Sequence, residues 1–459
     1  TPPAPVVEPP TLGTVTVTPA VTNATVSGTI TSVGNNGATA CDVYLALDSG
    51  AAMKIVEGAT AAFEYVISNL TAVTAYSWTL SVSNNAETVL GAETSGSFTT
   101  EAGSVEPGPE PEPGDAILPG ENAAATRQAI QDAIDAAVLT HGTVSLGNGL
   151  FEIDAQLNVT GGVTLVGQGW ANTVIKRVVN MSAWTAQRCV MLDDGAKLEG
   201  VVLTGGAIRA QSEYGAGALV KNGTISWCCI TNNVGSNHNV YGCGVSFTGG
   251  QGTIDHSIIA DNGQTAGASF YGGGIGALGT VGPVMIDTCL IARNSLTSGA
   301  GGGIGIKNLG GDCIVRNCTV VGNTANTHSA GIRIEDRASG NSSAKGVVIN
   351  TIATENMKSG DEVNYADNYV VDKTSSGNCF FGTSDEAALF AVSLFGDPKF
   401  VDAANGDYHI RSDSPAKGAG ASYSGIGKDL DGRQFAAAPS IGCYEISSGK
   451  KSGVIIFVR

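Results

Sequence analysis

GGGIGAL at 272–278 and MIDTCLIARN at 285–294 form one unit of a repeat that recurs along this chain. The first phrase returns as GCGVSF at 242–247, GGGIGIK at 301–307 and AGIRIE at 330–335. The second returns as TISWCCITNN at 224–233, TIDHSIIADN at 253–262, IVRNCTVVGN at 314–323 and VVINTIATEN at 347–356. A repeat of roughly thirty residues is typical of a solenoid in which each repeat forms one coil.

Each phrase alternates apolar and polar residues and is flanked by Gly, Asn, Ser and Thr, which indicates short strands joined by tight turns. Apolar residues recur at the same two positions of every second phrase, so these positions face the interior. Each second phrase also closes on asparagine. We expect these asparagines to form a ladder at a turn, because an amide can bond to the coils above and below. The predicted ladder is Asn233, Asn262, Asn294, Asn323 and Asn356.

The chain over roughly 115–446 resembles the right-handed parallel β-helix of the pectate-lyase-like superfamily, on the strength of these repeats. The predicted fold class is therefore all-β, a capped right-handed parallel β-helix preceded by a β-sandwich. This fold carries lyases, hydrolases, phage tailspikes, adhesins and purely structural proteins, so the resemblance alone leaves the function open.

Charge and hydropathy exclude some classes of partner. The formal net charge of −17 argues against nucleic acid and anionic membranes. No apolar run approaches 18 residues, so no membrane span is predicted. The chain begins at Thr1 without a signal-like stretch, and we interpret it as a mature exported chain that is extracellular or displayed on the cell surface. Ten cysteines leave the disulfide connectivity open.

Two segments and a sandwich precede the repeats. Residues 1–10 are proline-rich and predicted to be extended, and residues 101–114 form a proline and glutamate spacer. Residues 11–100 alternate as short strands do. The phrase LTAVTAYSWTLSV at 70–82 resembles the fibronectin type III pattern, which implies a sandwich in which Tyr76 supplies the corner hydroxyl.

A helix and a tail are expected to bound the β-helix. Residues 122–139 place Ile130 and Ile134 on one helical face, and such a helix can cover the open first coil. GDPKFVDAANGDYHIRSDSPAKGAG at 396–420, DLDGRQ at 429–434 and PSIGCYE at 439–445 resemble the C-terminal region of bacterial surface β-helix proteins of the choice-of-anchor type. In the tail at 447–459, we expect Val454–Val458 to be covered by the last coil or by another subunit.

One outward column carries the candidate chemistry. Asp255, Asp287 and Arg316 fall on three successive coils. β-Elimination on an acidic glycan needs a base and a cation that neutralises the uronate carboxylate, and the two aspartates are then candidates to hold Ca²⁺. The alternative to a catalytic site is a solvent-exposed ladder of ion pairs, which needs no cofactor. We favour this structural alternative. No histidine shows metal-ligand spacing, so no metal site is assigned.

A second outward row is aliphatic. Ile258, Leu290 and Ile352 stack in one stripe, which needs either a covering loop or a partner. The loops after each asparagine are long enough to fold back over it, and self-association is the other alternative.

The sequence favours a structural or adhesive surface protein, which can self-assemble into a layer or filament, over an enzyme. The motif sets of pectate lyases and polygalacturonases are missing, and RIED at 333–336 only approaches one of them. The alternative function is a polysaccharide-active enzyme, foremost a lyase on acidic glycans, and the second alternative is a non-catalytic glycan-binding module. The glycan, the anchor and the oligomeric state stay open.

Overall fold

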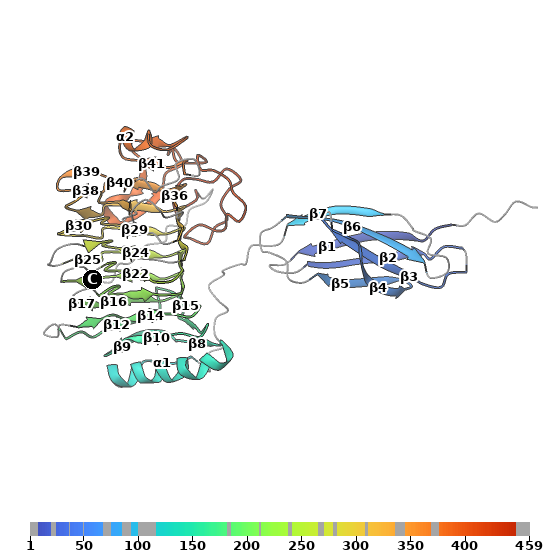
Figure 1. The fold of residues 1–459 in the computed structure, drawn as a ribbon, viewed down its shortest axis with the longest axis horizontal. Helices are drawn as coiled ribbons and strands as arrows, with labels where there is room; N and C mark the ends of the chain where they lie inside the picture. The colour runs from blue at the N-terminus through green and yellow to red at the C-terminus, as the bar shows by residue number, and fades with distance from the viewer. Residues whose placement is uncertain are drawn as a thin grey trace, which may run out of the picture. The chain divides into compact units, whose positions relative to one another are not determined.

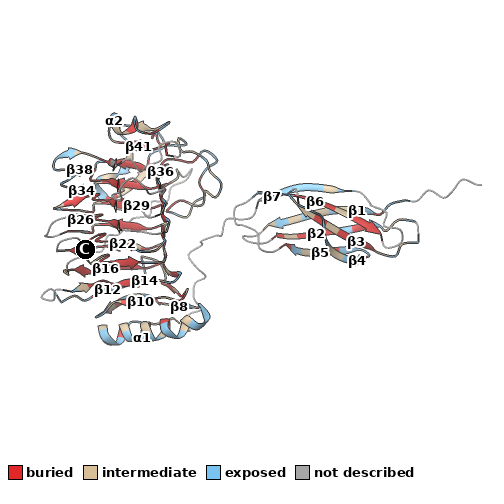
Figure 2. Ribbon diagram, in the orientation of Figure 1, coloured by how far each residue is buried: buried red, intermediate tan, exposed pale blue. Residues whose placement is uncertain are grey.

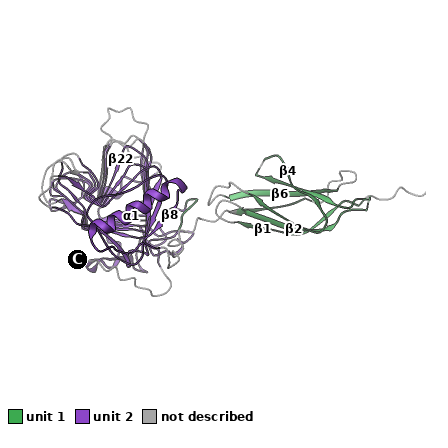
Figure 3. Ribbon diagram, turned by 90° about the horizontal axis from the view of Figure 1, so that it is seen from below, with its two compact units in different colours: residues 1–105, 423–427 green, residues 106–422, 428–459 purple. Residues whose placement is uncertain are grey.

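The computed structural model describes most of the 459-residue chain. The described residues are 8–19, 24–35, 37–48, 50–67, 75–84, 93–99, 116–180, 185–210, 213–236, 241–264, 270–278, 282–307, 311–335, 345–368 and 376–446. The predicted spacer at 101–114, the tail at 447–459 and most of the proline-rich start therefore lie outside the described residues. Two compact units contain residues 1–105 with 423–427, and residues 106–422 with 428–459 (Figure 3).

Within the described residues, the first unit is a sandwich of seven antiparallel strands. Its strands are β1 (Thr11–Pro19), β2 (Ala24–Ser32), β3 (Cys41–Leu47), β4 (Met53–Ala59), β5 (Ala62–Ile67), β6 (Ala75–Asn84) and β7 (Thr94–Thr99). They form two sheets, in the orders β1-β2-β5 and β4-β3-β6-β7. Alternating residues such as Val26, Val43 and Leu80 are fully buried between the sheets, as the period of two requires. The fibronectin type III assignment stays a prediction.

The second unit is a parallel β-helix built on three long sheets (Figure 1). Sheet I contains β10 (Leu157–Val159), β14 (Val190–Leu192), β18 (Ala218–Val220), β22 (Val245–Thr248), β27 (Ile275–Leu278), β31 (Ile304–Lys307), β35 (Ile332–Glu335) and β40 (Tyr365–Asn368). Sheet II contains β8 (Thr143–Ser145), β11 (Thr164–Val166), β15 (Ala196–Glu199), β19 (Gly223–Ser226), β23 (Gly252–Asp255), β28 (Val284–Asp287), β32 (Cys313–Arg316) and β36 (Gly346–Ile349). Sheet III contains β9 (Gly149–Ile153), β12 (Thr173–Arg177), β16 (Val202–Thr204), β20 (Cys229–Thr231), β24 (Ile258–Ala260), β29 (Leu290–Ala292), β33 (Thr319–Val321), β37 (Ile352–Thr354), β41 (Phe380–Phe381) and β42 (Leu394–Phe395). The predicted fold class is confirmed.

Short pairings complete the corners of the coils. They are β13 (Ala186–Gln187), β17 (Ala207–Ile208), β21 (Val234–Gly235) and β25 (Gly263–Gln264); β26 (Phe270–Tyr271) with β30 (Gly299–Ala300); and β34 (Thr324–Ala325), β38 (Met357–Lys358) and β39 (Asp361–Glu362). Among the described residues, none of the helices has the length and apolar character needed to cross a membrane.

The interior of the β-helix follows the alternation in the repeat (Figure 2). Ile254 and Ile286 of sheet II and Ile259 and Ile291 of sheet III are fully buried. All ten cysteines are free, and nine of them are buried. Burial raises the pKa of Cys228 to about 12, so this thiol behaves as a small apolar side chain.

The asparagines form a buried ladder at the corner after sheet III. The Nδ2 atom of Asn262 donates to Oδ1 of Asn294 at 3.0 Å, and that of Asn294 donates to Oδ1 of Asn323 at 3.0 Å. The same two oxygens also accept backbone N–H groups. Oδ1 of Asn294 accepts the N–H of Asn262 at 3.0 Å, and Oδ1 of Asn323 accepts the N–H of Asn294 at 2.9 Å. Asn233 and Asn356 continue the ladder, and Asn364 extends it by one further step. The amides therefore satisfy backbone groups that the turn leaves without partners.

The first coil is covered by α1 (Ala123–Ala137), which lies across one end of the β-helix and is followed by the 3₁₀ turn η1 (Val138–Thr140) (Figure 1). The Asn122 side chain caps the helix by accepting the backbone N–H of Ala125 at 2.9 Å. Ile130 and Ile134 are fully buried in the core of the β-helix. The helix thus shields the apolar interior that an uncapped solenoid would expose.

The last coils are closed by aromatic side chains beside α2 (Ser384–Ala387). The rings of Phe381 and Phe390 are stacked at 5.5 Å, and Tyr365 meets both of them edge-on. Beyond them the chain forms β43 (Phe400–Asp402), the 3₁₀ turn η2 (Ala403–Asn405) and β44 (Asp407–Ile410).

Residues 396–422 and 428–446, here called the C-terminal cover, lie on the outer face of sheet III. Ile258 and Leu290 pack in one buried cluster with residues that include Tyr408, Leu430 and Tyr444. Ile352 packs in a neighbouring cluster with residues of the same cover. Of the two alternatives for the aliphatic stripe, covering by the same chain is therefore correct. The segment that packs on the stripe is the C-terminal cover, whereas the sequence had offered the loops after the asparagines or a partner as equal alternatives.

Shortening Leu290 to alanine should lower the free energy of unfolding by about 2–4 kcal/mol, because the side chain is fully buried between sheet III and the cover. Chemical denaturation followed by circular dichroism measures this loss. Leu389→Ala is the matched control, since Leu389 is 40% exposed and its truncation should cost well under about 1 kcal/mol. Equal losses in the two variants would contradict the packing of the stripe under the cover.

Candidate functional site

From β15 to β37, each coil turns from sheet II to sheet III through a single residue in the left-handed conformation. The non-glycine residues at this corner include Trp227 (φ 52°), His256 (φ 42°), Thr288 (φ 52°) and Asn317 (φ 48°). This conformation costs a non-glycine residue about 1–2 kcal/mol, and a β-branched or bulky residue rarely adopts it. The stacked coils on either side therefore fix the backbone at this corner.

The predicted column lies directly before this corner, and the structure brings its three residues together. Asp255, Asp287 and Arg316 are register partners on β23, β28 and β32. An Arg316 nitrogen lies 2.7 Å from Oδ2 of Asp287. The carboxylate of Asp287 also accepts the hydroxyl of Thr288 at 3.0 Å and the amide of Asn317 at 3.1 Å.

Asp255 is held by its own donors, the Ser226 hydroxyl and Nδ1 of His256. The ring of His256 bridges to the cover, because its Nε2 lies 3.0 Å from the backbone oxygen of Lys428. Burial opposes a charge on this imidazole, but hydrogen bonding to Asp255 and Lys428 outweighs burial and raises its pKa. The column is thus a ladder of hydrogen bonds and one ion pair.

This geometry bears on the chemistry predicted for the column. Ca²⁺ prefers six to eight oxygen ligands, whereas Asp287 is committed to a guanidinium. Among the described residues, no group of three or more His, Cys, Asp or Glu side chains is arranged to hold a metal. The column therefore does not fit a calcium site well, and the Ca²⁺ assignment stays a prediction. Each aspartate already accepts protein donors, which favours the structural interpretation of the column over the catalytic one.

Two tryptophans beside the column were missed in the sequence. Trp227 stacks on His256 with ring centres 4.5 Å apart, and Trp170 lies 6.4 Å from Trp227. Trp170 also packs against the buried cluster beneath the cover. The recurrence of Trp227 and His256 at the same place in successive repeats was the available signal.

A second polar group lies on the outer face of sheet I. Arg333 and Glu335 on β35 form an ion pair at 2.8 Å, and both are buried, at 7% and 6% exposed. Glu335 is the register partner of Lys307 on β31. The Lys307 ammonium lies 4.3 Å from the centre of the Tyr271 ring, which in turn stacks on Tyr241 at 5.6 Å. Two cations, a carboxylate and an aromatic stack therefore share this face.

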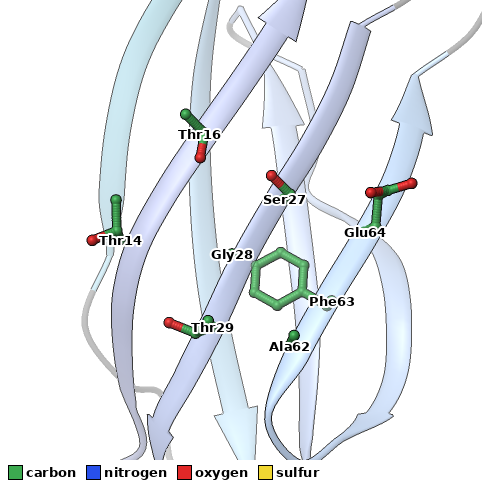
Figure 4. Close-up of a pocket in the computed structure, with 8 residues that line it drawn as sticks. All are labelled: Thr14, Thr16, Ser27, Gly28, Thr29, Ala62, Phe63 and Glu64. Atoms are coloured by element: carbon green, nitrogen blue, oxygen red, sulfur yellow. The ribbon is translucent and has the colours of Figure 1, made fainter.

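A shallow groove of about 460 Å³ crosses the sheet β1-β2-β5 of the first unit (Figure 4). Its lining residues are Thr14, Thr16, Ser27, Gly28, Thr29, Ala62, Phe63 and Glu64. Gly28 pairs with Phe63 across the strands, and a Cβ added at Gly28 would lie 2.6 Å from the Phe63 ring. The groove follows from this glycine–aromatic packing. Its hydroxyls and single carboxylate form no acid–base pair.

Comparisons with known proteins return solved structures only. No protein-family model matches this chain, and no curated protein matches it. A family 28 exopolygalacturonase from Yersinia enterocolitica is 13% identical, with 82% of this chain and 92% of that chain covered and a TM-score of 0.17. The catalytic unit of a thermostable family 87 α-1,3-glucanase from Streptomyces thermodiastaticus strain HF3-3 is 12% identical. The match covers 85% of this chain and 95% of that chain, with a TM-score of 0.15. The function must therefore be argued from the geometry of this chain.

Proposed function

We propose that the β-helix recognises an acidic polysaccharide on the outer face of sheet I, and that the protein does so outside the cell or at the cell surface. The observation that carries this proposal is the buried Arg333–Glu335 pair beside Lys307 and Tyr271. Desolvation makes a buried ion pair a poor source of stability. A binding role therefore explains this arrangement better than a contribution to stability.

The residue types fit a uronate-bearing glycan. Arginine and lysine bind carboxylates, and arginine does so with two parallel hydrogen bonds. An aromatic face such as that of Tyr271 offers an apolar surface to a sugar ring. Arg333 and Lys307 carry two positive charges against the one negative charge of Glu335, so this group is locally cationic in a chain with a net charge of −17.

β-Elimination is the reaction class that this set of residues supports. A base takes the proton beside the uronate carboxylate, and the C–H electron pair forms the new C=C bond. The bond to the glycosidic oxygen breaks, and this oxygen keeps the electron pair and takes up a proton from water. Arg333 would lie beside the carboxylate and help to neutralise it. Lys307 binds the glycan in its charged form, and it is the candidate base in the fraction of molecules in which its amine is neutral. The unsaturated product absorbs ultraviolet light, so a panel of uronate polysaccharides separates cleavage from binding alone.

Lys307→Gln should weaken binding of a uronate polysaccharide about tenfold, which corresponds to about 1.4 kcal/mol, because one charged contact is lost. Titration calorimetry measures the change, with a neutral glucan as the negative ligand. Lys399→Gln is the control, since Lys399 pairs with Asp413 in the cover, away from sheet I. Arg333→Ala is unsuitable, because leaving Glu335 buried without this partner would cost about 3–5 kcal/mol of stability. If the wild type and Lys307→Gln bound the uronate polysaccharide with the same affinity, the proposed binding site on sheet I would be wrong.

A structural or adhesive rod is the second candidate, and the column on sheet II favours it. Asp255 and Asp287 are satisfied by protein donors, and the aliphatic stripe is sealed by the cover. A molecule with both ends of its β-helix closed is suited to act as a rigid spacer. Electron microscopy of ordered assemblies, together with failure to bind any uronate, would favour this candidate over the first.

A further inference from the structure

His409 is the centre of a cluster of charges within the C-terminal cover. It lies on β44, next to Tyr408, whose hydroxyl accepts a hydrogen bond from Nη1 of Arg293 on the β-helix at 3.1 Å. The ring of His409 stacks on Tyr444, with centres 3.9 Å apart. Tyr408 and Tyr444 both belong to the cluster that buries Leu290. The position of His409 is therefore coupled to the packing of the cover on sheet III.

Both ring nitrogens of His409 face carboxylates. Nδ1 lies 2.6 Å from Oδ1 of Asp407, and Nε2 lies 2.8 Å from Oδ2 of Asp431. An ionised carboxylate only accepts hydrogen bonds, and a neutral imidazole donates only one. The doubly protonated imidazolium is thus the only form that satisfies both contacts. In the neutral form, one ring lone pair would face a carboxylate oxygen at hydrogen-bond distance.

The remaining charged groups do not replace this bridge. Arg433 pairs with Asp431, and Asp429 is fully buried and accepts the backbone N–H groups of Asp431, Arg433 and Glu445. The Tyr444 hydroxyl is kept neutral because burial raises its pKa well above the ordinary value. Removing the proton of His409 leaves three carboxylates, Asp407, Asp429 and Asp431, with Arg433 as their one cation within this cluster.

The direction of the pH effect follows from these contacts. Burial opposes the charge of His409, yet the hydrogen bonds to Asp431 and Asp407 outweigh burial and raise its pKa. Because the pKa of His409 is higher in the folded protein than in the unfolded chain, its protonation stabilises the fold. This stabilisation is complete at pH values below the pKa in the unfolded chain, near 6.5, and is lost as the pH rises through the pKa in the folded protein. The cover is thus most firmly held at mildly acidic pH and loosens towards alkaline pH.

We propose that the Asp407–His409–Asp431 bridge is a pH-sensitive clip. It holds β44 against residues 429–433 and so keeps the C-terminal cover packed on sheet III. Loss of the imidazolium proton opens the clip and increases exposure of the aliphatic stripe at Ile258, Leu290 and Ile352. This clip is independent of the polysaccharide site proposed on sheet I.

Hydrogen exchange of the full chain at about pH 6 and about pH 8.5, corrected for the intrinsic rates, tests the clip. Peptides from 400–416 and 428–446 should lose protection at the higher pH, roughly tenfold for each unit by which the pKa is raised, while a core peptide at 157–166, whose apolar residues pack inside the β-helix, should not. His409→Gln should show reduced protection of the cover already at pH 6 and a smaller further loss on raising the pH than the wild type, because His256, which bonds to Lys428, still titrates. Equal protection of the wild-type cover at both pH values would overturn the proposal.

His141→Gln is the matched control, because Nδ1 of His141 contacts only the Gly161 oxygen, which a neutral imidazole can satisfy. It should keep the wild-type pH profile of the cover. If His409→Gln keeps that profile instead, the pH response arises elsewhere, for example at His256, and the clip is refuted. Nitrogen NMR of the imidazole provides a readout that needs no variant. A neutral His409 ring at about pH 6 would equally refute the proposal.

Discussion

Replacing Asn294 by alanine is expected to lower the free energy of unfolding by about 3–6 kcal/mol. Its Oδ1 accepts both the backbone N–H and the side-chain amide of Asn262, each at 3.0 Å. Its Nδ2 donates to the carbonyl of Ile259 at 2.8 Å. Truncation removes all of these bonds, although the side-chain amide of Asn262 keeps its bonds to the carbonyls of Ile230 and Ala260. Each buried group that loses its partner costs about 1–3 kcal/mol. Equilibrium denaturation followed by far-ultraviolet circular dichroism measures the change.

Asn405→Ala is the matched control for this variant. Asn405 is exposed in η2 and donates only to Asp402, so its loss should cost less than about 0.5 kcal/mol. If Asn294→Ala lowered the free energy of unfolding no more than this control does, the asparagine ladder would not be a source of the stability of the fold. Asn262→Ala should repeat the large loss, because Asn262 holds Asn233 in the same way.

Gly276→Ala is expected to destabilise the β-helix by about 3–5 kcal/mol or to prevent its folding. A Cβ on Gly276 would lie 2.2 Å from the Gly242 nitrogen and 2.7 Å from the Tyr271 oxygen. Both are backbone atoms, which cannot rotate away as a flexible side chain could. Gly305 repeats the arrangement one coil further, 2.3 Å from the Gly272 nitrogen. Soluble yield and thermal unfolding report the effect.

Gly249→Ala separates the steric clash from the ordinary cost of replacing a glycine. Gly249 has a φ of +75°, and no atom lies within 4 Å of its added Cβ. Its replacement should cost about 1–2 kcal/mol through the left-handed backbone alone. A Gly276→Ala variant no less stable than Gly249→Ala would show that the backbone does not pack as closely against β27.

The repeat was sufficient to predict the stacking of the coils. Register between neighbouring coils follows from aligning the phrases, so the juxtaposition of Asp255, Asp287 and Arg316 could be predicted from their common position. The capping role of residues 122–139 could also be predicted. The apolar face of this helix is next to the open first coil in the sequence, and it packs on the apolar interior that this coil would otherwise expose. The structure ends this helix at Ala137, with a short 3₁₀ turn beyond it.

The site was harder to predict, because its residues gain their roles from burial. Arg333 and Glu335 appeared in the sequence only as an incomplete motif, whereas the structure shows a buried ion pair beside Lys307. His409 carried no recognisable spacing at all. Its two carboxylate partners, Asp407 and Asp431, come from different segments of the cover.

The sequence by itself determined the β-helix, its asparagine ladder and the existence of an aliphatic stripe at Ile258, Leu290 and Ile352. These features depend on a short pattern repeated at nearly constant spacing, which any stack of coils must place in register. Only the tertiary structure decided what covers the stripe. The deciding contacts join residues far apart in the chain, such as Arg293 with Tyr408 and His256 with Lys428, and no local periodicity specifies such pairs.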